Sequence, residues 1–235
     1  MSQLNILSGG AAQGLVGSLA SAFKAETGFG IAGEFGAVGI MADKLRNGTP
    51  ADIVILTAAL VARLAEENLV AAASITDVGL VETALAVRTG DPVVEVTDAD
   101  GLREALLGSD AIYVPDTKAS TAGIHVAKVL NQLGIADEVA ARLRMFPNGA
   151  TAMRELVASD ARHPVGCTQS TEIISTAGVT LAGSLPPGCE LATMYSAGIT
   201  KAATHATQAR RLIELLIGDG QRKQREQAGF VSGTK

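Results

Sequence analysis

Short runs of apolar residues alternate along this chain with longer stretches in which apolar residues recur every three or four positions. The first pattern predicts strands, and the second predicts helices that cover them. In the first part of the chain we expect strands at 4–8, 30–35 and 52–56, and helices at 11–26, 36–46 and 58–67. The segment 52–56 is continuously apolar after its first residue, which is typical of a strand buried on both faces of a parallel sheet. This order predicts an α/β layer.

The pattern changes near 83–89, where Gly90, Asp91 and Pro92 interrupt it, and a second α/β series follows. In this series we expect strands at 111–114, 164–168, 179–185 and 192–199, and helices at 98–107, 121–133, 137–143, 150–158, 204–217 and 221–227. The chain is therefore predicted to be an α/β protein with two doubly wound lobes and a ligand cleft between them.

The composition of the chain limits the kinds of molecule that we expect it to bind. The 235 residues carry a formal charge of −5, and only 18% are charged and 3% aromatic. Without a basic cluster or a set of aromatic rings for base stacking, nucleic-acid binding is not expected. No apolar run reaches the roughly 20 residues of a membrane span, and the N-terminal residues do not resemble a signal peptide. As written, the sequence predicts a cytoplasmic protein, or a periplasmic one if a leader has been removed.

Small residues follow a predicted strand and open a predicted helix at four places. A helix begins with backbone N–H groups that have no partner inside the helix, and with a partial positive charge. Because glycine and alanine leave these amides accessible, each such turn is a candidate seat for an anion. The candidate binding residues are Gly9, Gly10, Ala11, Ala12 and Gln13, then Gly36, Ala37, Val38 and Gly39, then Ala122 and Gly123, then Asn148, Gly149 and Ala150, together with Thr168 and Gln169 after the strand at 164–168.

These turns also have a purely structural interpretation. Glycine is the usual residue wherever the backbone needs a positive φ angle or close packing, so one such turn does not identify a site. Ligands in open α/β sheets nevertheless collect outside the carboxyl ends of the strands. Four such turns facing one cleft could bind a small oxyanion or carboxylate without any Lys or Arg side chain.

Several segments resemble the type II periplasmic solute-binding proteins, and most closely the molybdate-binding protein family. They are LNILSGGAAQGL, EFGAVGIMADKL, TPADIVILTA, STAGIHVAKVLNQLGI, FPNGATAMRELV and HPVGCTQSTEI, and they span essentially the whole chain. The resemblance implies two lobes joined by crossing strands that close on a small anion. It also implies that the C-terminal helices return to the first lobe, so lobe 1 is expected at 1–82 with 196–235 and lobe 2 at 83–195.

The chain departs from this family at positions that would bind the oxyanion. The molybdate binders have serine in the first turn, where this chain has Ala11, and several serines in the second, where it has the residues 36–39. The family's binding tyrosine falls at Gln169. Replacing each donor with an apolar group should cost about 1–3 kcal/mol, which disfavours molybdate. A small organic acid fits better, because backbone amides can hold its carboxylates and polar side chains its other oxygens; these side chains are Gln13, Asn148, Thr168 and Gln169.

Two functions of different classes remain open. The first is a solute-binding protein for a small organic acid or oxyanion, which would have an ABC permease as partner only if it is exported. The second is a cofactor-free isomerase, because the same superfamily includes an aconitate isomerase that moves a proton across an allylic tricarboxylate. Neither function requires a cofactor or a metal, and no nucleophile–base or metal-binding motif is present.

A few side chains are candidates for contact with the ligand, each with a structural alternative. Glu172 follows the strand at 164–168, where it is either a partner for a helix dipole or, in a dry cleft, a proton carrier with a raised pKa. His125 lies in the first turns of its predicted helix and either packs or faces the ligand. Tyr113 and Tyr195 lie on predicted inter-lobe strands and have the same two interpretations.

Overall fold

The computed structural model describes residues 2–231. Contacts divide the chain into two compact units, unit 1 comprising Met1–Val81 with Thr193–Lys235 and unit 2 comprising Glu82–Ala192. The nine strands in the described residues follow the order β2-β1-β3-β9-β4-β7-β5-β6, and β8 pairs with β4 outside this path. None of the helices within these residues has the length and apolar character to cross a bilayer.

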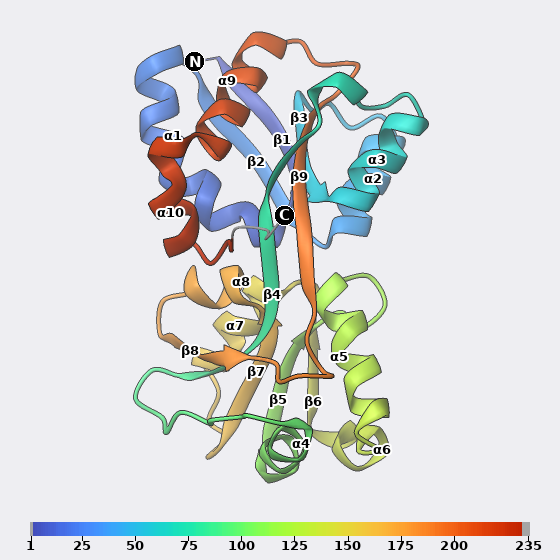
Figure 1. Ribbon diagram of the computed structural model, residues 1–235, viewed down its shortest axis with the longest axis vertical. Helices are drawn as coiled ribbons and strands as arrows, with labels where there is room; N and C mark the ends of the chain where they lie inside the picture. Colours follow the sequence, from blue (N-terminus) through green and yellow to red (C-terminus); the bar gives the residue numbers. More distant parts are fainter. Residues whose placement is uncertain (1, 232–235) are drawn as a thin grey trace. The chain divides into compact units, whose positions relative to one another are not determined.

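In unit 1, strands and helices alternate as the apolar pattern predicts. The elements are β1 (Gln3–Gly9), α1 (Gln13–Thr27), β2 (Gly30–Gly36), α2 (Val38–Arg46), β3 (Ile53–Thr57), α3 (Ala58–Glu66), β9 (Ala192–Ile199, whose first residue belongs to unit 2), α9 (Ala206–Ile217) and α10 (Arg222–Gln227), with 3-10 turns at Gly10–Ala12, Ala72–Ser74 and Asp219–Gln221. β1 is parallel to both β2 and β3, whereas β9 is antiparallel to β3. Figure 1 shows α1 beside α9 on one side of these strands and α2 beside α3 on the other.

Helix α1 illustrates how the sequence determines these elements. Leu15, Leu19 and Phe23 recur at helical spacing, and all three are buried in the core of unit 1. The helix ends at Gly28, whose φ of +74° is a left-handed conformation that glycine adopts without the steric penalty of a Cβ atom.

Unit 2 places helices on both faces of its strands. The elements are β4 (Thr76–Arg88, which begins in unit 1), α4 (Ala99–Gly108), β5 (Ala111–Pro115), α5 (Thr121–Gln132), α6 (Ala136–Val139), β6 (Leu143–Phe146), α7 (Gly149–Val157), β7 (Pro164–Gln169), α8 (Ser170–Ile174) and β8 (Val179–Ser184), with a 3-10 turn at Ala140–Arg142. β5 is parallel to β6 and β7, and β4 is antiparallel to β7 and β8. Figure 1 shows these strands with α5 on one side and α7 and α8 on the other.

The core of unit 2 follows the period of two along β4. Leu85 belongs to a cluster with residues of α4, α5 and β5, whereas Ala84 and Ala86 belong to a second cluster with α7 and α8. Successive side chains of a strand point to opposite faces, so β4 contributes to both layers of helices.

The α/β class predicted from the sequence is confirmed, with three corrections. The sheet is mixed, because β9 and β4 add antiparallel pairings to the parallel strands. The helix expected at 137–143 is wrong beyond Val139, since the chain passes through a 3-10 turn into β6. This strand has four residues, none of them buried, so it lacks the apolar run that identifies a strand. The long strand β4 also escaped prediction, being visible only as a change of pattern near 83–89.

Candidate functional site

The first two predicted turns of unit 1 lie side by side. Gly9, the last residue of β1, is opposite Gly36, the last residue of β2, in the parallel register of these strands. A 3-10 turn, Gly10–Ala12, separates β1 from α1, while Ala37 alone separates β2 from α2. The N-cap residues of α1 and α2 are Ala12 and Ala37, and neither caps its helix with a side chain of its own. Two helix N-termini with alanine at the N-cap therefore meet at the carboxyl edge of the sheet, where α/β proteins bind ligands.

Tyr195 determines how closely the backbone packs at this edge. A Cβ atom built on Gly9 would lie 2.9 Å from Tyr195 Cε1 and 2.8 Å from Val38 Cγ1. Tyr195 is itself buried and faces Thr57 across the β3–β9 pairing. Glycine at position 9 is therefore required for packing, whether or not its amide also holds a ligand.

The remaining candidates of unit 1 differ in exposure. Residues 10–12 and 36–38 are buried, Gly39 is half-buried and Gln13 is exposed. A ligand at the buried residues 10–12 and 36–38 could contact only their backbone, whereas the side-chain amide of Gln13 is accessible to it.

The predicted turns of unit 2 also share one edge, because β6, β5 and β7 are parallel neighbours. Pro115, at the end of β5, is opposite Phe146, at the end of β6. Thr168 and Gln169 are the last residues of β7, and the candidates Ala122, Gly123, Asn148, Gly149 and Ala150 lie at the N-termini of α5 and α7, which follow β5 and β6. Gly123 packs against the chain, since a Cβ atom there would lie 2.1 Å from the carbonyl oxygen of Asp116.

The N-terminus of α7 is occupied from within the protein. The side chain of Asn148 accepts a hydrogen bond from the Thr151 amide at 2.8 Å and caps the helix. The amides of Gly149 and Ala150 donate to the carboxylate of Glu172, which belongs to α8. A Cβ atom on Gly149 would lie 1.9 Å from Glu172 Oε2, so only glycine permits this approach.

Glu172 is buried, with 5% of its surface exposed. It accepts hydrogen bonds from the Thr168 hydroxyl at 2.6 Å and from the backbone amide of Gln169, in addition to the backbone amides of Gly149 and Ala150. Burial raises the pKa of Glu172 because it disfavours the charged form, and the hydrogen bonds offset only part of this effect. Glu172 thus caps α7 from α8 and has a raised pKa.

Other side chains considered in the sequence are held by the protein. His125 Nε2 lies 2.8 Å from the carbonyl oxygen of Cys189, to which it donates, and Tyr113 stacks on Phe146 with ring centroids 5.9 Å apart. Burial raises the pKa of the Cys167 thiol to about 12. His125 and Tyr113 therefore have packing partners within unit 2, and Cys167 stays a thiol at neutral pH.

The carboxylate of Asp52 joins segments of unit 1 that are distant in the chain, a role that was not predicted from the sequence. Its buried carboxylate accepts hydrogen bonds from the amides of Asn5, Thr204 and His205, each at 2.9 Å. Burial raises its pKa, but these bonds outweigh burial, so the pKa of Asp52 is lowered overall. The partners lie far away in the chain, and only the N-terminal position of Asp52 beside β3 could have suggested this role.

Comparison with known proteins assigns the chain to a family. A model of the bacterial extracellular solute-binding proteins matches residues 4–231. The chain belongs to this family. Within the described residues no group of three or more His, Cys, Asp or Glu side chains could hold a metal ion.

Three similar proteins illustrate the range of this scaffold. Aconitate isomerase of a Pseudomonas species is 25% identical over 235 residues, covering 97% of this chain and 87% of that protein. The periplasmic molybdate-binding protein of Azotobacter vinelandii has a TM-score of 0.81 at 20% identity, covering 98% of this chain and all of that one. The sulfate-binding protein SubI of Mycobacterium tuberculosis H37Rv has a TM-score of 0.74 at 20% identity, covering 98% and 86%. The two structures confirm the type II solute-binding fold.

Proposed function

We propose that this protein binds a small organic acid through backbone amides at the carboxyl ends of its parallel strands. The observation that carries the proposal is the pairing of Gly9 with Gly36, which brings together the N-termini of α1 and α2, whose N-cap residues are both alanine. Such N-termini attract anions. The cleft between two lobes expected from the sequence remains part of this proposal, as does an ABC permease partner for an exported protein.

The chemistry of the turns favours carboxylates over tetrahedral oxyanions. The residues at 10–12 and 36–39 carry no hydroxyl group, so a ligand there meets amides and methyl groups. In unit 2, the Thr168 hydroxyl and the first amides of α7 already donate to Glu172. A tetrahedral oxyanion would find no hydroxyl donors at 10–12 or 36–39, whereas a carboxylate needs fewer donors and its carbon skeleton tolerates apolar contacts.

A substitution at the N-cap of α2 tests this proposal. Ala37→Asp adds a carboxylate that caps the helix and repels an anion, while Ala37→Asn is its uncharged match. Thermal shift and calorimetry with molybdate, sulfate and a panel of di- and tricarboxylates should find an organic acid that stabilises the wild type most. Ala37→Asp should weaken its binding about tenfold more than Ala37→Asn, since an unfavourable charge contact of this kind is worth about 1 kcal/mol or more. Stronger stabilisation by molybdate than by every organic acid would contradict the proposal.

A second candidate function is proton-transfer isomerisation of a polycarboxylate. It is favoured by the similarity to aconitate isomerase along nearly the whole chain and by the buried Glu172 with its raised pKa. Proton NMR in D₂O with cis- and trans-aconitate should show interconversion and deuterium uptake, both lost in Glu172→Gln and retained in Glu155→Gln, a change at an exposed residue of α7. Binding without conversion or deuterium uptake would leave the solute-binding function alone.

A further inference from the structure

A pocket of about 250 Å³ lies at the opposite end of β7 from the candidate site. Its wall includes Pro164 and Val165 at the start of β7, whereas the candidates Thr168 and Gln169 lie at its end. With a rise of about 3.3 Å per residue, the two ends of this strand are roughly 16 Å apart. We call the turns at 9–13, 36–39, 122–123 and 148–150 the amide-lined turns. The pocket lies at the opposite end of the unit 2 strands from the two amide-lined turns of that unit.

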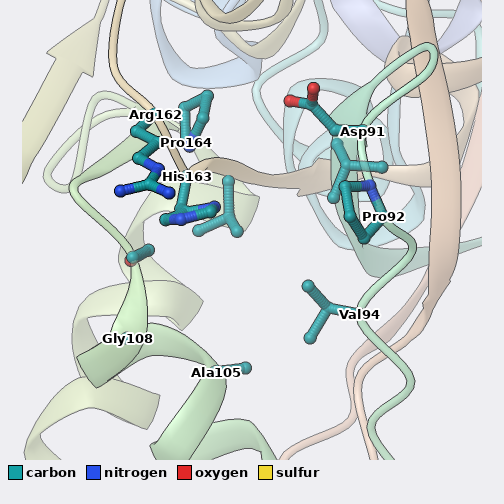
Figure 2. A pocket seen from close by; sticks show the side chains of 11 residues that line it. Asp91, Pro92, Val94, Ala105, Gly108, Arg162, His163 and Pro164 are labelled. Carbon is teal, nitrogen blue, oxygen red and sulfur yellow. The ribbon is translucent and has the colours of Figure 1, made fainter.

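Three segments of unit 2 enclose the pocket. One is the irregular chain after β4, one is the end of α4 with the residues that follow it, and one is the segment that leads into β7. Figure 2 shows Pro92 and Val94 on one wall, Arg162 and His163 on the facing wall, and Ala105 below them. Val87 and Val165 add further apolar surface. The interior is thus suited to a compact apolar group.

The charged groups around the pocket leave one cation without a partner. Asp91 is neutralised by Arg88, whose Nε lies 2.7 Å from its carboxylate. Asp110 accepts a hydrogen bond from the His163 amide at 3.0 Å. Within residues 2–231 the guanidinium of Arg162 has no hydrogen bond or ion pair, and the His163 ring has none either. An anion entering the pocket would therefore meet Arg162 with all its donors available and the His163 ring beside it.

We propose that this pocket is a second ligand site, which takes a small monocarboxylate with a compact apolar body. The carboxylate pairs with Arg162 and contacts His163, while the apolar body lies against Pro92, Val94 and Ala105. A cavity with apolar walls and one converging charged group is the usual form of a small-molecule site. This proposal is independent of the function proposed for the amide-lined turns.

Benzoate is a suitable probe, because it joins a carboxylate to a flat apolar ring. In a methyl-labelled sample, benzoate should shift the methyl resonances of Val87 and Val94. Arg162→Ala should weaken binding about tenfold, as expected for the loss of a charge-assisted pair. Arg103→Ala removes an exposed cation of α4 that does not line the pocket and should bind benzoate as the wild type does.

A further variant keeps the test decisive. Ala105→Leu should exclude benzoate from this pocket by filling it, and the shifts at Val87 and Val94 should disappear. Methyl shifts confined to Ala11, Ala12, Ala37 or Val38, equal binding by Arg162→Ala and wild type, or Arg162-dependent binding of inorganic phosphate but not of benzoate would each overturn the proposal. Failure of every carboxylate in the panel at the turns, with benzoate still bound here, would refute only the function proposed above.

Discussion

The carboxylate of Glu172 accepts a hydrogen bond from the hydroxyl of Thr168 at 2.6 Å, four residues earlier in the chain. The same carboxylate accepts from the amides of Gly149 and Ala150 at the N-terminus of α7. A helix end that the sequence predicts as a seat for an external anion is thus occupied by a carboxyl group of the protein. The stability of unit 2 should depend on this contact.

Glu172 should make stability decrease as the pH rises. Burial raises its pKa above the value of 4.5 that applies to an exposed chain. Between 4.5 and the raised value the native state holds more protons than the unfolded state, so the free energy of unfolding falls with increasing pH. Urea unfolding should show wild type losing stability relative to Glu172→Gln as pH rises from 4.5 to neutral. The exposed change Glu155→Gln should follow the wild type, and a constant difference between wild type and Glu172→Gln would contradict the prediction.

Gly149→Ala should destabilise the protein. The added Cβ atom would lie 1.9 Å from Glu172 Oε2 and 2.1 Å from Thr168 Oγ1, so the contact that caps α7 must open. We expect a loss of about 1–3 kcal/mol, as for overpacking in other cores. Gly17→Ala is the control, because that position in α1 has no atom within 4 Å. It should raise stability by about 0.5–1 kcal/mol, and equal effects of the two substitutions in chemical denaturation would show that the close approach is unimportant.

Removal of the Asp52 carboxylate should be costly. Asp52→Ala leaves the amides of Asn5, Thr204 and His205 without an acceptor, and we expect a loss of about 2–4 kcal/mol in unfolding experiments. Asp100→Ala, at an exposed residue of α4, should change stability by less than about 0.5 kcal/mol. Because the pKa of Asp52 is lowered, its contribution should be present above 3.8 and disappear as the pH falls through the lowered value. Equal acid sensitivity of wild type and Asp52→Asn would refute this account.

The two cysteine thiols should be unreactive in the native protein. Cys167 and Cys189 are both buried, and burial raises the pKa of both, that of Cys167 to about 12. The thiolate is the reactive form, so a chromogenic disulfide reagent at neutral pH should label neither residue before unfolding and both afterwards. Rapid labelling of one thiol in the folded protein would show that unit 2 opens locally around it.

Much of the chain could be predicted because local patterns coincide with burial. The buried face of α1 and the apolar run of β3 identify these elements directly. β6 was not predicted because none of its four residues is buried. β4 was not predicted because it continues from one unit into the other. The strand–helix turns could be predicted from their small residues, because the size of a residue is visible at each position of the sequence.

The sequence by itself determined the α/β class, the family and the positions of the four small-residue turns, because these depend on periodicity and residue size over a few positions. Only the tertiary structure decided which turns lie side by side and which helix N-terminus the carboxyl group of Glu172 reaches. Gly9 meets Gly36 through the register of two strands, and Glu172 reaches Gly149 from another helix. Both relationships join residues more than twenty positions apart, and hydrogen-bond partners at such separations are chosen by packing rather than by local sequence.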